Sequence, residues 1–134
     1  MSSYALLYNF SGKQAEMLKM VCTVVGVHFR DVKPEEFNQQ LGALFEIPGM
    51  TLTEEPCKDI LFAEEMLVLH GFDRIKLEKY LELLDRMNVG NIPLKAMLTE
   101  NNRVWSGKEL YDELCKERAA FKEMQENRQN QTEE

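Results

Sequence analysis

The stretch that decides the fold is MLVLHGFD, from Met66 to Asp73, which follows the same pattern as YALLYNFS, from Tyr4 to Ser11. Each stretch opens with a short, nearly continuous apolar run, which is typical of a strand covered on both faces. Each run ends in a turn, and the turn is followed by a residue that can cap a helix. Both stretches therefore predict a central strand that leads into a helix.

Apolar residues recur at helical spacing after both stretches. The first helix is expected to run from Ser11 to Gly26, because a glycine suits the left-handed residue that ends many helices. The second is expected to run from Asp73 to about Asn88. The predicted buried stripes are Met17, Leu18, Val21, Val24 and Val25 in the first helix, and Ile75, Leu77, Tyr80, Leu81, Leu84 and Met87 in the second.

Two further strands and two further helices complete the pattern. Residues 27–32 and 92–98 alternate between apolar and polar, which favours half-exposed strands, and Pro93 argues for an edge position because it cannot donate to a ladder. Pro34 suits the first turn of a helix, and Ser106 the cap of the last one. The helix after Pro34 would bury Phe37, Leu41, Leu44 and Phe45.

The resulting order, βαβα twice, predicts an α/β domain with a small, mostly parallel four-stranded sheet and the strand order 2-1-3-4. A ferredoxin-like βαββαβ sheet is the alternative, but it leaves one helix surplus. The predicted division is a single domain over 1–121, half-repeats 4–46 and 65–121, a connector 47–64 with a possible short helix over 56–63, and a polar tail 122–134 that frays.

Composition and charge exclude some classes of partner. The chain of 134 residues is 44% hydrophobic and carries a net charge of −7. Because a phosphate backbone would be repelled by this mean charge, no nucleic acid is expected. No stretch approaches the ~20 apolar residues of a membrane span, so no membrane is expected either.

The cysteines and the N-terminal residues predict a location. Cys22, Cys57 and Cys115 are an odd number, lie far apart and form no CxxC pair, so reduced thiols fit better than disulfides or zinc. The first residues lack the basic and long apolar regions of a signal peptide. We therefore expect a cytoplasmic protein.

A candidate site follows from the predicted sheet. In open α/β sheets, ligands bind beyond the carboxyl ends of the central strands, where helix N-termini offer free N–H groups. The loop from Thr99 to Trp105 should leave the last strand at the same end. The candidate binding residues at the two central strands are Asn9, Ser11, Gly12, His70, Gly71 and Asp73.

Each of these residues also has a structural interpretation. Ser11 and Asp73 are more often helix caps than catalytic groups, and His70 lacks a paired nucleophile or metal partner in the sequence. The sequence contains no GxGxxG, Walker A, GxSxG or HExxH motif. We therefore assign no catalytic residue and no metal ligand, and the sequence names no cofactor.

The second half of the chain resembles a known family. It carries MLVLHGF at 66–72, IPLKAMLT at 92–99, then Asn102, Trp105 and LYDEL at 110–114. In these residues the chain resembles bacterial domain-of-unknown-function family 3783. The first half, with LLYNF and NQQLG, resembles the usual N-terminal portion of such proteins. The resemblance implies a bacterial cytoplasmic protein and points to Lys95, Thr99, Asn102 and Trp105.

Three functions remain open at this stage. The first is a non-enzymatic interaction or regulatory module that binds an unknown protein partner or forms a homodimer through an outer strand or the last helix. The second is a small-molecule or anion sensor at the strand ends. The third is a small hydrolase or transferase with His70 or Asp73 as the base. The last two need a real pocket at the strand ends, whereas the first predicts apolar surface elsewhere.

Overall fold

The protein folds around an open four-stranded sheet with helices on both faces, as a computed structural model of residues 2–58, 60 and 62–132 shows. The strand order is β2-β1-β3-β4, which confirms the predicted fold class and the predicted order. The two continuous apolar runs are the central strands, and the two alternating segments are the outer ones. The strand bounds are Ser3–Tyr8 for β1, Val27–Val32 for β2, Met66–His70 for β3 and Leu94–Met97 for β4.

The direction of the strands divides the sheet into two units. β1 pairs with β2 in parallel, and β3 pairs with β4 in parallel. The central pair, β1 with β3, is antiparallel, and Leu6 faces Val68 at its middle. The sheet is thus mostly parallel, as expected, but it is built from two β-α-β units that run in opposite directions.

Corresponding positions of the two units meet at the centre of the sheet. The helix α1 spans Gly12–Val25 after Ser11, and α3 spans Arg74–Arg86 after Asp73. Aligning these two helix starts makes Leu6 correspond to Val68, the pair that faces itself across β1 and β3. An antiparallel pair of corresponding residues lies on a local two-fold axis, so this axis relates the two units.

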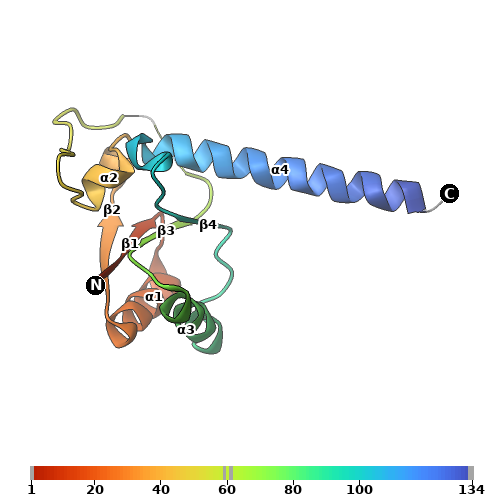
Figure 1. The fold of residues 1–134 in the computed structure, drawn as a ribbon, viewed down its shortest axis with the longest axis horizontal. Helices are drawn as coiled ribbons and strands as arrows, with labels where there is room; N and C mark the ends of the chain where they lie inside the picture. The colour runs from red at the N-terminus through yellow and green to blue at the C-terminus, as the bar shows by residue number, and fades with distance from the viewer. Residues whose placement is uncertain (1, 59, 61, 133–134) are drawn as a thin grey trace.

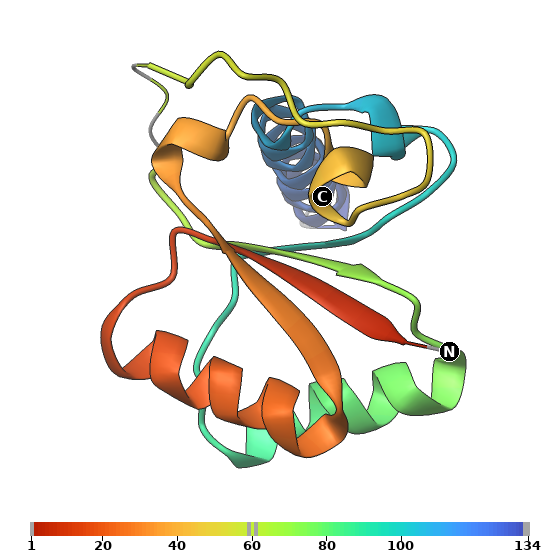
Figure 2. The ribbon, with the colours of Figure 1, turned by 90° about the vertical axis from the view of Figure 1, so that its left-hand side faces the viewer.

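The two faces of the sheet carry different helices (Figure 2). α1 and α3 lie side by side on one face and run antiparallel, and Leu18 and Tyr80 are fully buried beneath them. The other face is covered by the short helices η1 (Pro34–Glu36), α2 (Leu41–Leu44) and η2 (Asn102–Val104) and by the start of α4 (Gly107–Thr132).

The helix expected after Pro34 is interrupted, and this prediction is wrong in its continuity. Its apolar residues are buried as expected, but the backbone between η1 and α2 bonds to other segments. The Gln39 side chain donates to the Thr53 carbonyl and accepts from the Thr53 N–H, both at 2.8 Å. The Leu41 N–H donates to the Trp105 carbonyl at 2.9 Å. These tertiary hydrogen bonds replace the helical ladder.

Two other expectations need correction. The described part of 56–63 contains no helix, and residues 59 and 61 lie outside the described residues. The polar segment after Lys122, expected to fray, is helical to Thr132. As a result α4 is the longest helix of the described chain, and its second half projects away from the body (Figure 1).

Candidate functional site

The cleft expected at the strand ends does not form. Because β1 and β3 are antiparallel, Tyr8 at the end of β1 faces Met66 at the start of β3, and His70 faces Tyr4. The turn that follows β1 and the turn that follows β3 therefore lie at opposite edges of the sheet. The prediction that Asn9, Ser11 and Gly12 lie beside His70, Gly71 and Asp73 is wrong.

The turn after β1 fastens the connector. Asn9 has a left-handed backbone (φ 67°), and its Nδ2 donates to the Phe62 carbonyl at 2.9 Å and to the Glu64 carbonyl at 3.4 Å. Ser11 occupies the N-cap of α1, but its side chain makes no capping hydrogen bond. Gly12 has φ 61° with open space around it. These contacts hold chain segments together. A hollow of about 270 Å³ lies beside Asn9 and the end of β2, but neither Ser11 nor Gly12 lines it.

The turn after β3 packs on the start of β1. Gly71 has φ 81°, and a Cβ built there would lie 2.3 Å from the Ser2 carbonyl oxygen, so only glycine fits. The Ser3 hydroxyl donates to the Gly71 carbonyl at 2.8 Å. The His70 ring lies between those of Tyr4 and Phe45, with centroids 6.2 and 5.3 Å away. Gly71 and His70 are thus packing positions in this structure.

The residues singled out by the family resemblance close the loop after β4. The Thr99 N–H donates to Oδ1 of Asn102 at 2.8 Å, and the Asn102 N–H donates to Oγ1 of Thr99 at 3.1 Å. Nδ2 of the buried Asn102 donates to the Met97 carbonyl at 3.0 Å. Trp105 is half-buried against the core. Lys95 lies apart from them, beside α3.

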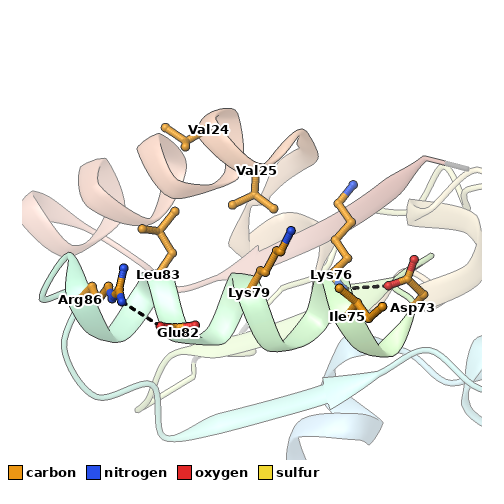
Figure 3. Close-up of a pocket in the computed structure, with 9 residues that line it drawn as sticks. All are labelled: Val24, Val25, Asp73, Ile75, Lys76, Lys79, Glu82, Leu83 and Arg86. Atoms are coloured by element: carbon orange, nitrogen blue, oxygen red, sulfur yellow. Dashed lines mark hydrogen bonds and ion pairs between the residues drawn. The ribbon is translucent and has the colours of Figure 1, made fainter.

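An open groove between α1 and α3 is the best-formed candidate surface (Figure 3). We call it the basic groove. It has a volume of about 570 Å³ and lies between the last turn of α1 and the outer side of α3. Val25 points from α1 toward α3, while Lys76 and Lys79 point from α3 toward α1. The lining residues are Val24, Val25, Asp73, Ile75, Lys76, Lys79, Glu82, Leu83 and Arg86.

Two apolar side chains at this groove are largely exposed, although the sequence pattern predicted that they would be buried. Val24 is 70% exposed and Ile75 is 68% exposed. The sequence assigned both to buried helical stripes, and this assignment is wrong. A usable signal was present, since Ile75 lies two residues from Leu77 and five from Tyr80, spacings that place it away from their face.

The charge of the groove is opposite in sign to that of the chain. Three cationic side chains line it, against the carboxylates of Asp73 and Glu82. Asp73 is used as the cap of α3, since its Oδ1 accepts from the Lys76 N–H at 2.7 Å, and Glu82 pairs with Arg86 at 3.1 Å. Lys79 makes no hydrogen bond or ion pair within the part of the chain that the structure describes. Lys79 therefore has a charge available for a partner.

Lys76 also joins the two helices. Its Nζ donates to the carbonyl of Gly26, the C-cap of α1, at 3.3 Å. The last turn of α1 has no basic residue of its own, so Lys76 supplies the cation that favours the negative end of that helix. This contact fixes the spacing of the groove walls.

The strongest pKa shifts belong to core residues. Burial raises the pKa of Tyr8 on one face of the sheet. Burial also raises the pKa of Cys22 and of Tyr80 on the other face, where the two side chains bond at 3.2 Å. All three side chains are fully buried and none lines the basic groove. These shifts therefore report packing and do not mark a reactive site at the groove.

The described residues show neither a metal-binding cluster nor a membrane-spanning helix. No group of three or more His, Cys, Asp or Glu side chains among them could hold a metal ion. Within the same residues, every helix is either too short or too polar to cross a membrane.

The protein is thus a small α/β domain, and the basic groove lies on the face formed by α1 and α3. Residues 65–121 match the family model described as Domain of unknown function (DUF3783). No curated protein and no solved structure matches the chain. The matched segment contains α3, the cationic wall of the groove, whereas α1 lies outside it.

Proposed function

We propose that the chain is a non-enzymatic interaction module that docks an amphipathic helix of a partner protein, one with acidic side chains beside its apolar face, in the basic groove. One observation carries this proposal: exposed Val24 and Ile75 lie at a groove that also presents the available cation of Lys79.

The exposed apolar side chains of the basic groove favour a partner that removes them from water. Exposed apolar side chains that share a concave surface gain stability when a partner covers them. An amphipathic helix supplies such a cover, because its apolar residues recur on one face and fit a groove between two helices. Val24 and Ile75 come from different walls, so one inserted helix would contact both.

The charges of the basic groove favour an acidic partner over a basic one. Glu82 is paired with Arg86, and the two lysines outweigh the remaining carboxylate of Asp73, which caps α3, so the net charge of the groove is positive. Carboxylates beside the apolar face of the docked helix would meet Lys79 and Lys76, while a basic helix would be repelled.

The sensor and enzyme alternatives depended on the strand-end cleft. Both required a pocket between the turn at Asn9 and the turn at His70, and the antiparallel pairing of β1 with β3 puts these turns at opposite edges of the sheet. This supports the interaction module over either alternative. A bacterial and cytoplasmic setting is part of the proposal, and the three free thiols suit a reducing compartment.

The experiment uses two synthetic helical peptides that share one leucine face, flanked by glutamates in one peptide and by lysines in the other. Each is titrated into the full chain labelled with ¹⁵N, and amide shifts are followed. The expected result is saturable shifts confined to the last turn of α1 and to α3, with the glutamate peptide only. Shifts spread over the surface, or no shifts with either peptide, would overturn the proposal.

Two variants and a matched control sharpen this test. Ile75→Ser should weaken binding of the glutamate peptide, and Lys79→Glu should reverse the preference toward the lysine peptide. Met20→Ser is the control, since Met20 is an exposed apolar residue of α1 outside the groove. If Met20→Ser weakens binding as much as Ile75→Ser does, the groove is not the docking surface.

A further inference from the structure

The projecting half of α4 has an apolar stripe that no described segment of the chain covers. α4 has 26 residues, about 39 Å at 1.5 Å per residue. Every residue from Lys116 to Arg128 is exposed, including Phe121 at 62% and Met124 at 59%. Figure 1 shows this half of the helix standing clear of the body.

The stripe continues the face by which α4 packs on its own core. Leu110 is buried and Leu114 is half-buried against the sheet. At about 100° per residue, Phe121 and Met124 lie on the same side of the helix as these two leucines. Glu117 and Arg128 also lie on this side of the helix. The spacing is that of positions a and d in a heptad.

A helix this long and polar gains little from its own turns. Isolated helices of about 12–15 residues are marginal in water, and most helical stability in proteins comes from packing of an apolar face. Arg118 is fastened to the body by a two-bond ion pair with Glu64, which raises the pKa of Arg118 and lowers that of Glu64. Beyond Arg118, packing on a partner would add stability.

We infer that the projecting half of α4 pairs antiparallel with the same segment of a second copy. In that register Phe121 of each copy lies beside Met124 of the other, and Glu117 of each copy lies opposite Arg128 of the other. A parallel pair in register would instead place Glu117 against Glu117 and Arg128 against Arg128. The charges at the stripe therefore select the antiparallel arrangement.

Symmetry makes this interface self-limiting. The same patch is used by both copies, so the contact closes as a two-fold dimer and does not propagate. The dimer leaves the basic groove untouched, since no groove residue belongs to α4. Failure of dimerisation and failure of peptide docking are thus separate outcomes.

The test is sedimentation of the full chain at concentrations on the order of 100 µM. The native chain should sediment as a dimer in exchange with monomer, and Phe121→Ser should raise the dissociation constant by at least about tenfold. Glu126→Lys is the matched control, because Glu126 is exposed on the opposite side of α4 and should leave the constant unchanged. A monomeric native chain, or a dimer that survives Phe121→Ser, would overturn the inference.

The register has its own test. Glu117→Lys and Arg128→Glu should each weaken the homodimer, because each places like charges opposite one another twice. An equimolar mixture of the two variants should form a heterodimer at native strength, since both pairs are then complementary. A mixture that stays as weak as either variant alone would rule out the antiparallel register.

Discussion

The two ends of the α1–α3 layer have the same backbone plan and different chemistry. At one end Lys76 Nζ donates to the Gly26 carbonyl after α1, at 3.3 Å. At the other end Gln14 Nε2 donates to the Asn91 carbonyl after α3, at 3.1 Å. Lys76 and Gln14 are corresponding residues of the two β-α-β units, each three positions beyond its helix cap. Each end thus has one side chain that ties its helix start to the turn after the other helix.

The grooves beside these two contacts differ in what they expose. The basic groove holds about 570 Å³, and the opposite groove, lined by Lys13, Gln14, Met17, Met87, Asn88 and Val89, holds about 400 Å³. Ile75 corresponds to Lys13, and Lys79 corresponds to Met17. Of these two grooves, only the basic groove combines largely exposed apolar side chains with a cation that has no partner among the described residues. Side chains, and not the backbone arrangement, therefore distinguish the end that we propose as a docking surface from the opposite end.

The largest predicted effect concerns the turns before the two helices. Gly71→Ala should lower the free energy of unfolding by about 2–5 kcal/mol, because it combines a left-handed backbone with a Cβ against the Ser2 carbonyl. At the corresponding Asn9, Asn9→Gly should cost only about 1 kcal/mol, for the lost hydrogen bonds to the connector. Urea unfolding of both variants measures the difference. Equal losses would contradict the packing of Gly71 on β1.

The helix caps give the next contrast. Asp73→Ala should cost about 1 kcal/mol, because it removes the hydrogen bond to the Lys76 N–H. Ser11→Ala at the corresponding position should change stability by less than about 0.5 kcal/mol, since the Ser11 side chain makes no capping bond. Thermal unfolding of the two variants side by side measures this contrast. A loss at Ser11 as large as that at Asp73 would mean that the two ends are capped alike.

The buried pair of Cys22 and Tyr80, between α1 and α3, should make the free energy of unfolding fall at high pH. Tyr80→Phe removes the hydrogen bond to Cys22, at a cost of about 1 kcal/mol or less. Burial raises the folded pKa of both groups, so the stability of the native chain is complete below the ordinary thiol pKa of 9.0 and falls as the pH rises above it. Unfolding measured at pH 7 and at pH 10 tests the direction. Stability that stays constant or rises with pH over this interval would contradict the raised pKa values of the two groups.

The smallest predicted effect separates charge from hydrogen bonding. Lys76→Met and Gln14→Met should each cost about 0.5 kcal/mol. The cost of Lys76→Met should shrink in high salt, because the ammonium interacts with the negative end of α1, whereas that of Gln14→Met should not. Unfolding in low and high salt distinguishes them. The same salt response in both variants would remove the electrostatic difference between the two ends.

Much of the fold could be predicted from local pattern. Two continuous apolar runs gave the central strands, Pro93 placed β4 at an edge, and Gly26 ends α1 in the left-handed conformation. Each of these features depends on residues close together in the sequence. The helix expected after Pro34 failed because its hydrogen bonds go to distant residues such as Thr53 and Trp105.

The candidate site could not be predicted because it depends on the direction of β3. The connector 47–64 is long enough to return the chain to either edge of the sheet, and nothing in the apolar run of β3 encodes its direction. That one choice separates Ser11 from His70 and removes the expected cleft. Asp73, which was predicted to lie at the strand-end cleft, instead lines the basic groove, where its side chain caps α3.

The pairing of β1 with β3 is the claim on which the account depends, and proton–proton distances test it most directly. In antiparallel strands every second facing pair, the non-hydrogen-bonded one, has Cα atoms about 4.5 Å apart and α protons in close contact, and parallel strands have no such pairs. The account predicts strong α-proton contacts between β1 and β3, centred on Leu6 and Val68, and none between β1 and β2. Absence of these contacts between β1 and β3 would contradict it, return Asn9 and His70 to one edge, and restore the strand-end cleft as the candidate site.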